Sequence, residues 1–355
     1  MIKLNADKNV LIKAIEAVVH KTVSMDLTWD WPCGVAYYGV SEAFAVTRNE
    51  AYLRLLKERV DEHIALGLPT HWTVNACAMG HCLITLHEAT GERVYWDIAL
   101  SKVEYLRKRA LRFADRVLQH TVSANNDFPE QAWADTLFMA AFFLLRMGVK
   151  AQDEEVIHDA LHQYYWHIQY LQDRTTGLWF HGYNHLQRDH MSGFCWARAN
   201  AWAAYTMAQV RERLPRPYLY PQYMDVDCSL RDQLAGLKAL QTENGLWRTV
   251  LNDSDSYEEL SASCGIAAAM LLNDNPLHTK HVKNACEGML RNITEDGRLL
   301  NVSGGTAVMN DLDGYRSISR DWVQGWGQGL ALVFLAAVLE KSAKTQSIEE
   351  VALFE

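Results

Sequence analysis

Asp135 is the carboxylate in this sequence that is best placed to donate and accept a proton. It follows Pro129, opens the most apolar helical segment of the chain and has Trp133 and Phe138 close to it in sequence. Aromatic neighbours that exclude water raise the pKa of a carboxyl, which suits a general acid working near neutrality. A helix N-terminus has the opposite effect, and Asp135 can also be an ordinary acid that satisfies the free N–H groups there. The sequence alone leaves both interpretations open.

A second candidate group lies in the segment CWARANAWAAYTMA, where Trp196, Arg198, Asn200 and Trp202 interrupt a run of small residues. The spacing predicts a buried helix, and an arginine there needs a partner because an unpaired buried charge is very costly. One interpretation is an ion pair with a carboxylate of the chain itself. The other is that the guanidinium holds a substrate carboxylate through two hydrogen bonds, with the two tryptophans as walls of the site.

Aromatic residues are abundant: the chain contains 12 Trp, 15 Tyr and 14 His, many of them beside glycines at expected loop–helix junctions. Such residues suit a cleft that stacks rings on sugar faces and hydrogen-bonds hydroxyls, although core packing explains most individual aromatics. The sequence has no His-Glu-x-x-His, no Gly-x-Ser-x-Gly, no Walker loop and no Gly-x-Gly-x-x-Gly after an expected strand. We therefore expect no metal and no other cofactor.

Composition and charge exclude several classes of protein. Of the 355 residues 49% are hydrophobic and 22% charged, which is enough for a large core. The net charge of −9, without a Lys/Arg-rich block, argues against nucleic-acid and anionic-membrane partners. The apolar runs are too short to span a bilayer, the N-terminus lacks a long apolar segment, and the seven cysteines form no Cys-x-x-Cys pair. We expect a cytoplasmic protein with reduced thiols.

The elements that must position these residues are almost all helical. The seven prolines fall between the apolar periodic segments, where a missing N–H donor does no harm. Apolar spacing of three and four residues predicts about twelve helices, near residues 9–21, 34–47, 50–67, 74–89, 99–121, 133–147, 153–171, 195–212, 226–242, 258–272, 277–292 and 325–341.

The second half of the chain contains a weak repeat. The segments TTGLWFHGY from residue 175, ENGLWRTVL from residue 243 and EDGRLLNVS from residue 295 each place a glycine turn and an apolar pair before a helix rich in small residues. Because small residues let helices approach closely, the repeat indicates helical hairpins closed into a ring. We expect an all-α (α/α)6 barrel of six hairpins, one domain over residues 1–355, with the Gly-Leu-Trp loops at one rim.

Several ordered segments resemble one known family. These are WDWPCGVAYYGVSEAF, HWTVNACAMGHCLITL, WADTLFMAAFFLLRMG, GLWFHGY, CWARANAWAAYTMA and RDWVQGWGQGLALVFLAAVLE. Together they are similar to the motifs of the unsaturated rhamnogalacturonyl hydrolases of glycoside hydrolase family 105, which are related to the unsaturated glucuronyl hydrolases. The resemblance implies an (α/α)6 barrel and hydration of the C4=C5 double bond that pectin lyases leave in a terminal uronic acid. Neither a metal nor a second displacing carboxylate is implied.

The resemblance also assigns roles to individual residues. It implies that Asp135 is the general acid and base. It places around the unsaturated sugar the residues Trp31, Asn75, His181, Trp196, Arg198 and Trp202, with Arg198 a candidate for the sugar carboxylate. Two positions depart from the family pattern, since Asn75 stands where the family usually has a second Asp, and Trp31 beside Pro32 stands where it usually has Tyr. Loss of that second carboxylate should lower the pKa of Asp135 by removing a like charge.

Two other functions stay open on the sequence. Asn75 motivates a catalytically silent sugar-binding toroid. The second open function is a different α/α-barrel enzyme, such as a sugar epimerase or an inverting glycosidase. An inverting glycosidase needs a second positioned carboxylate, for which Asp189 and Asp321 are weak candidates. The expected partner is a small unsaturated oligosaccharide, not a nucleic acid or a membrane. The sequence leaves open whether the protein is a monomer or a dimer.

Overall fold

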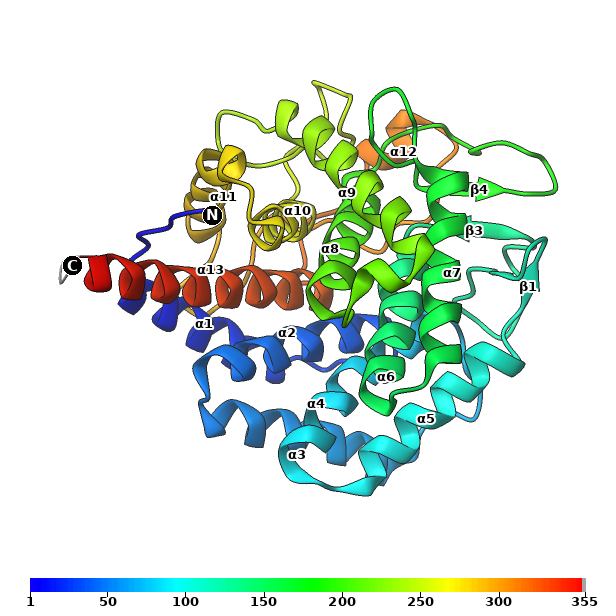
Figure 1. Ribbon diagram of the computed structural model, residues 1–355, viewed down its shortest axis with the longest axis horizontal. Helices are drawn as coiled ribbons and strands as arrows, with labels where there is room; N and C mark the ends of the chain where they lie inside the picture. Colours follow the sequence, from blue (N-terminus) through cyan, green and yellow to red (C-terminus); the bar gives the residue numbers. More distant parts are fainter. Residues whose placement is uncertain (353–355) are drawn as a thin grey trace.

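The computed structural model describes the backbone of residues 1–352 and the side chains of residues 1–346. Twelve of the described helices pair as six hairpins, each with an outer helix followed along the chain by an inner one (Figure 1). The outer helices are α1 (Lys8–Val23), α3 (Glu50–Leu66), α5 (Arg93–Lys108), α7 (Glu154–Leu171), α9 (Pro221–Ala239) and α11 (Thr279–Leu290). The inner helices are α2 (Trp31–Thr47), α4 (Gly80–Thr90), α6 (Phe143–Ala151), α8 (Ala197–Arg213), α10 (Leu260–Asn273) and α13 (Gly325–Ala352).

The inner helices form a closed ring. The 3₁₀ turn η1 (Asn75–Met79) leads into α4, and the π-helical turn η2 (Leu137–Phe142) leads into α6. Contacts run from α13 to α2, from α2 to η1 and α4, from η1 to η2, from η2 to α8, from α8 to α10 and from α10 back to α13. The predicted (α/α)6 barrel is therefore confirmed.

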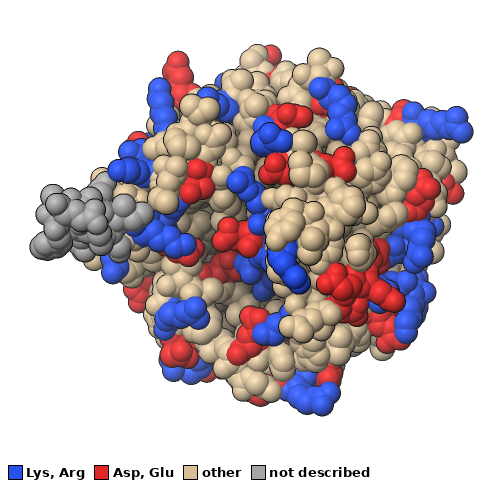
Figure 2. Space-filling view, viewed as in Figure 1, with Lys and Arg blue, Asp and Glu red and all other residues tan. Residues whose placement is uncertain are grey.

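Burial separates the two layers of the ring. Every residue of α8 from Ala197 to Val210 is buried, as is nearly all of α10, because an inner helix contacts neighbours on all sides. The outer helix α3 buries only one face, formed by Tyr52, Leu53, Leu56 and Val60. Figure 2 shows basic and acidic side chains interspersed over one face of the molecule.

The three glycine turns of the weak repeat have the same structure. Gly177, Gly245 and Gly297 have φ values of 75°, 83° and 81°, which are unfavourable for any residue with a Cβ atom. A Cβ atom on each would also meet a backbone oxygen of the next outer helix, that of Asp232 in α9, Asn284 in α11 or Ala17 in α1. The turns thus fix each inner helix against the outer helix of the following hairpin.

One predicted helix was wrong in its second half. Residues 99–121 were expected to form one helix, but α5 begins at Arg93 and ends at Lys108. The chain then forms the antiparallel pair β1 (Arg112–Phe113) and β2 (Val117–Leu118), because Ala114 and Arg116 adopt positive φ and turn the backbone. The Arg112 guanidinium holds this hairpin to α7 through two hydrogen bonds to Asp159, of 2.9 and 2.7 Å.

Three smaller features complete the fold. The strands β3 (Gln131–Trp133) and β4 (Gly182–Asn184) pair antiparallel, and a short helix α12 (Leu312–Arg316), which the periodicity did not predict, precedes α13. Figure 1 shows β1, β3 and β4 on the side of the molecule away from the chain termini. The seven cysteines carry free thiols, six of them buried. Among the described residues no helix is both long and apolar enough to span a membrane.

Candidate active site

The N-terminal ends of the inner helices meet at one rim of the ring. Trp31 begins α2 and stacks on Trp326 in the first turn of α13, with ring centroids 4.5 Å apart. Trp326 lies 5.4 Å from the guanidinium of Arg198 in the first turn of α8, and Arg198 pairs with Glu259 at the start of α10. Because helix N-termini carry free N–H groups and a positive partial charge, this rim favours an anionic ligand.

Asp135 lies at this rim and faces His181. Strand β3 leads into Asp135, strand β4 follows His181, and Trp133 pairs with Gly182, so the two candidate residues are set across from each other. The His181 carbonyl accepts a hydrogen bond from Ala134 N–H at 3.1 Å. His181 Nε2 is then 3.4 Å from Asp135 Oδ2, and the two side chains are 0% and 14% exposed. The pair is close enough to share a proton after a small adjustment.

The charges around Asp135 decide which of the two opposing effects on its pKa prevails. Burial raises the pKa of this carboxyl, but the hydrogen bond and charge of His181, together with the charges of His120 and Arg198, outweigh burial and leave the pKa below its ordinary value. Burial also lowers the pKa of His181 despite its carboxylate partner. The pair at neutral pH therefore consists of the Asp135 carboxylate and a neutral imidazole.

Aromatic rings line both sides of this pair. On one side the Trp133 ring is 5.3 Å from His181 and stacks on His120 at 4.4 Å with an angle of 9°. On the other side the Trp196 ring is 4.1 Å from His181 and 4.4 Å from the Arg198 guanidinium. Together with Trp31 and Trp326 these rings form a wall that suits the apolar faces of sugars.

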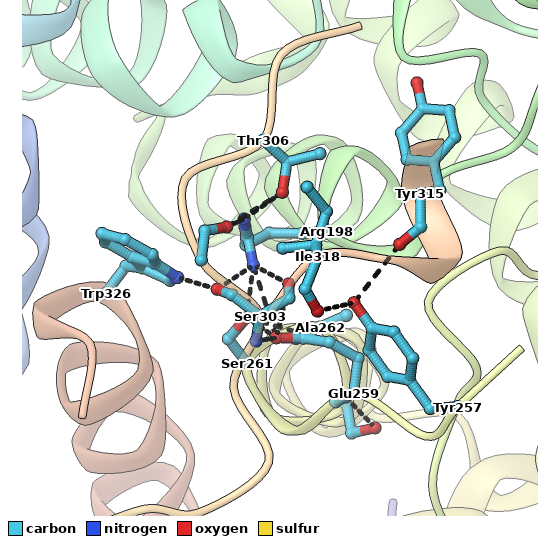
Figure 3. Close-up of polar contacts among 12 residues, drawn as sticks. Arg198, Tyr257, Glu259, Ser261, Ala262, Ser303, Thr306, Tyr315, Ile318 and Trp326 are labelled. Atoms are coloured by element: carbon cyan, nitrogen blue, oxygen red, sulfur yellow. Dashed lines mark hydrogen bonds and ion pairs between the residues drawn. The ribbon is translucent and has the colours of Figure 1, made fainter. Parts of the chain in front are cut away.

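Arg198 forms the structural ion pair that the sequence left as one alternative. Figure 3 shows its guanidinium surrounded by polar groups of Glu259, Ser303 and Thr306. Nη1 contacts Glu259 Oε1 at 3.3 Å and Ser303 Oγ at 2.6 Å, and Nη2 donates to the Gly304 carbonyl at 2.8 Å. The residue is 1% exposed, so a bidentate hold on a substrate carboxylate would have to replace these bonds. In this arrangement Arg198 acts on Asp135 through its charge.

Asn200, the other polar residue in the first turn of α8, also bonds within the protein. Its Oδ1 accepts from Trp179 N–H at 2.8 Å, and its Nδ2 donates to the carbonyls of Trp179 and Trp196 at 2.8 and 2.9 Å. Its amide therefore joins the first glycine turn to α8.

Asn75 and Trp202 lie on elements next to Asp135. Asn75 is 5% exposed on η1, which packs against η2, and Trp202 is fully buried on α8 with its ring 4.9 Å from Phe138. Among the described residues, Asn75 Oδ1 and Trp202 Nε1 are buried without a hydrogen-bond partner, and Asp135 Oδ2 and His181 Nε2 have only their mutual 3.4 Å contact. A polyhydroxylated ligand has the donors and acceptors that such atoms require.

Asp189 and Asp321, the weak candidates for a second carboxylate, have exposed side chains that are bound locally. Asp189 Oδ1 accepts from Met191 N–H at 2.9 Å, and Asp321 Oδ2 accepts from Ser319 Oγ at 2.7 Å. Among the described residues no group of three His, Cys, Asp or Glu side chains could hold a metal ion.

Two further residues of the site, Glu259 and Tyr315, have no direct signal in the sequence. Glu259 is 1% exposed and caps α10 through Ala262 N–H at 2.6 Å. Its signal was indirect, since a buried Arg198 requires a carboxylate and Glu259 directly precedes a small-residue helix. Tyr315 is fully buried and hydrogen-bonded to His181, but it lies on a five-residue helix with no periodicity that could have revealed it.

Comparisons with known proteins identify the family of this chain. The family model described as Glycosyl Hydrolase Family 88 matches residues 5–341. The chain belongs to this family. It is 46% identical over 341 residues to the unsaturated rhamnogalacturonyl hydrolase YesR of Bacillus subtilis (strain 168), covering 96% of this chain and 98% of that protein. The family resemblance predicted from the sequence is confirmed, and the protein is a glycoside hydrolase.

Solved structures of this glycoside hydrolase's relatives share the fold. A possible member of the GH105 family from Salmonella enterica serovar Paratyphi A superimposes with a TM-score of 0.89 at 27% identity over 96% of both chains. The unsaturated glucuronyl hydrolase from Bacillus sp. GL1, at 16% identity and a TM-score of 0.68 over 93% of this chain and 96% of that one, shows the same helical barrel.

Proposed function

We propose that this hydrolase acts on unsaturated uronyl oligosaccharides of the kind that pectin and rhamnogalacturonan lyases release, with Asp135 as general acid and base. The observation that carries the proposal is the Asp135–His181 pair, 3.4 Å apart inside an aromatic wall at the N-terminal rim of the barrel. The Bacillus subtilis relative, an unsaturated rhamnogalacturonyl hydrolase that matches nearly the whole chain, supports the same substrate class.

The proposed reaction consumes one water molecule. A proton from Asp135 adds to C4 of the C4=C5 bond, and water, deprotonated by the resulting Asp135 carboxylate, adds its oxygen to C5. The product at C5 is a hemiketal, whose C5–O5 bond breaks to give a ketone and a hydroxyl on C1. The hemiacetal at C1 then releases the neighbouring sugar as an alcohol and leaves an aldehyde. Because no bond to the anomeric carbon is displaced directly, one carboxyl is enough.

The lowered pKa of Asp135 fits this cycle when the charge of the substrate is included. A bound uronate brings its own carboxylate to the rim, and a like charge close to Asp135 raises the pKa of its carboxyl. We propose that the helix N-termini compensate the uronate charge, and that Trp31, Asn75, Trp196 and Trp202 contact the sugar. Arg198 remains buried in this proposal and acts on Asp135 through its positive charge.

The compartment and the extent of the catalytic unit belong to the same proposal. Seven free thiols are typical of a reducing compartment, which supports action in the cytoplasm. The family model covers residues 5–341, which supports one catalytic domain.

The test is incubation with an unsaturated uronyl-rhamnose disaccharide prepared with a rhamnogalacturonan lyase. The wild-type protein should remove the ultraviolet absorbance of the conjugated double bond and release rhamnose, and Asp135→Asn should reduce kcat by at least about 10³-fold, since it removes the proton donor. Asp189→Asn is the matched control, because Asp189 is an exposed acid at the end of the hairpin that carries His181.

Two results would contradict the proposal. If Asp135→Asn turns over at the wild-type rate, Asp135 is not the acid. If the wild-type protein binds the disaccharide but leaves the absorbance unchanged, the protein is the silent sugar-binding toroid.

A further inference from the structure

Tyr315 places its phenol hydroxyl at the edge of the His181 ring that is opposite to the edge facing Asp135. Its oxygen is 2.9 Å from His181 Nδ1, whereas Nε2 of the same ring faces Asp135 Oδ2. Figure 3 shows Tyr315 on α12, in the segment that precedes α13. The side chain is fully buried, and its ring centroid lies 5.9 Å from that of His181. A residue more than 100 positions away in sequence thus contacts the catalytic pair.

The donors and acceptors around this hydroxyl fix the direction of its hydrogen bond. Met309 N–H, which can only donate, points to the Tyr315 oxygen at 3.3 Å. The Ser192 hydroxyl is farther from it, at 3.5 Å, and can donate as well. Burial raises the pKa of Tyr315 to about 12, so its single proton is present at neutral pH. The short 2.9 Å contact then receives that proton, and His181 Nδ1 accepts it.

A neutral imidazole that accepts at Nδ1 carries its own proton on Nε2. That proton points at the Asp135 carboxylate, whereas the opposite tautomer would direct a lone pair at it. The charged or titratable groups that face Asp135 are His181, His120, Arg198 and Tyr315. Of these, His181 has the largest lowering effect on the pKa of Asp135.

We propose that Tyr315 is a positioning residue that holds His181 in the tautomer with its proton on Nε2, aimed at Asp135. The inference rests on the proposed function for its effect on turnover, but the tautomer itself is a property of the free protein. Tyr315 acts through His181 and does not touch the reacting carbons in this argument.

The segment that carries Tyr315 is anchored by contacts other than this hydroxyl. The Arg316 guanidinium donates to both Asp253 oxygens at 2.7 and 2.6 Å. The Tyr257 hydroxyl donates to the carbonyls of Tyr315 and Ile318 at 3.5 and 3.4 Å. Tyr315→Phe should therefore leave α12 in place, and Tyr257→Phe removes a hydroxyl that binds the same segment but does not contact His181.

The experiment compares these two variants with the wild type. Imidazole ¹⁵N NMR of the free protein, with the His181 signals assigned by comparison with His181→Gln, should show the Nε2–H tautomer in the wild type and in Tyr257→Phe. Tyr315→Phe should show a mixture of both tautomers. The kcat of Tyr315→Phe should fall about 10- to 100-fold with a much smaller change in KM, because the change affects proton transfer more than binding.

The pH profile gives a second readout. Weakening the His181 hydrogen bond raises the pKa of Asp135, so the basic limb of kcat/KM for Tyr315→Phe should move to higher pH, and that of Tyr257→Phe should stay. An equal loss in both variants would reduce Tyr315 to an anchor of α12 and overturn the proposal. An unchanged His181 tautomer in Tyr315→Phe would overturn it even if the wild-type protein proved inactive on the disaccharide, so the two proposals fail separately.

Discussion

Asn75 is one of the two residues at which the sequence departs from the pattern that the family resemblance implies. It lies on η1, which packs against η2, and its N–H donates to the carbonyl of Thr121 beside His120. Asn75→Asp would place a second carboxylate near Asp135 and raise the pKa of Asp135 by like-charge repulsion. The basic limb of kcat/KM should move to higher pH, because Asp135 keeps its proton over a wider range.

The measurement is a pH–rate profile on the unsaturated disaccharide, with Asn75→Ala as the control that removes the amide without adding charge. The basic limb of Asn75→Ala should stay at the wild-type pH. A profile of Asn75→Asp that coincides with that of Asn75→Ala would show that residue 75 is too far from Asp135 to couple to it.

The proximity of Asp135 and His181 could be predicted from the sequence, but several of their partners could not. Asp135, His181 and Trp196 come together as the family resemblance implies. The sequence around Arg198 indicated only that a buried arginine needs a carboxylate partner. That partner is 61 residues away, at the start of the next inner helix. No local pattern selects Glu259 from the 43 acidic residues of the chain, since the choice depends on how the ring closes.

At the level of elements, one polar residue in each of three inner helices binds the glycine turn before it. Asn200, Ser263 and Gln328 are each the fourth residue of their helix, and each accepts the backbone N–H two positions after the turn glycine, at 2.8, 2.9 and 2.7 Å. The weak repeat in the sequence is therefore a repeat of hydrogen bonding, which explains why a buried helix carries an amide.

Asn200→Ala should destabilise the protein by about 1–3 kcal/mol, because it leaves the buried N–H of Trp179 without its acceptor. Urea unfolding followed by tryptophan fluorescence measures the loss. Asn244→Ala is the control, since Asn244 is an exposed residue of the second turn with its amide bound to the half-buried Glu258, and its effect should stay within about 0.5 kcal/mol. Equal stability of the two variants would refute the structural role of Asn200.

Element boundaries were predictable where glycine or proline marks them. The turns at Gly177, Gly245 and Gly297 have the positive φ that their residue type suggests. The end of α5 was missed because Ala114 and Arg116 make the turn after it, and neither residue type favours positive φ. The Arg112–Asp159 pair to α7 holds that turn, and such a tertiary contact is invisible to periodicity.

For the molecule as a whole, the six hairpins could be counted from the sequence, but the seam that closes the ring could not. The last inner helix, α13, packs along α2 and α1, so residues about 290 positions apart become neighbours. Figure 1 shows α13 lying along α1 and α2. The same seam brings Trp31 and Trp326 together at the active-site rim. The contact that closes the ring therefore also forms one wall of the site.

Gly39→Ala tests this seam. A Cβ atom on Gly39 would meet the backbone oxygen of Gly329, and a Cβ atom on Gly329 would meet that of Val35, so the two helices must separate. Alanine normally stabilises a helix interior by about 1 kcal/mol relative to glycine, whereas overpacking costs about 1–3 kcal/mol. We expect the cost of overpacking to exceed the gain in helix propensity, because the contact is with backbone atoms that cannot rotate away. The thermal midpoint should fall by a few degrees.

Activity should change with stability in this variant. Separation of α2 from α13 loosens the Trp31–Trp326 stack, so KM for the disaccharide should rise more than kcat falls. Gly305→Ala is the control, since a Cβ atom there meets nothing within 4 Å and its φ is not positive. A Gly39→Ala protein that is more stable than the wild type would show that α2 and α13 can accommodate the extra methyl group. The close contact of these two helices would then not set the shape of the site.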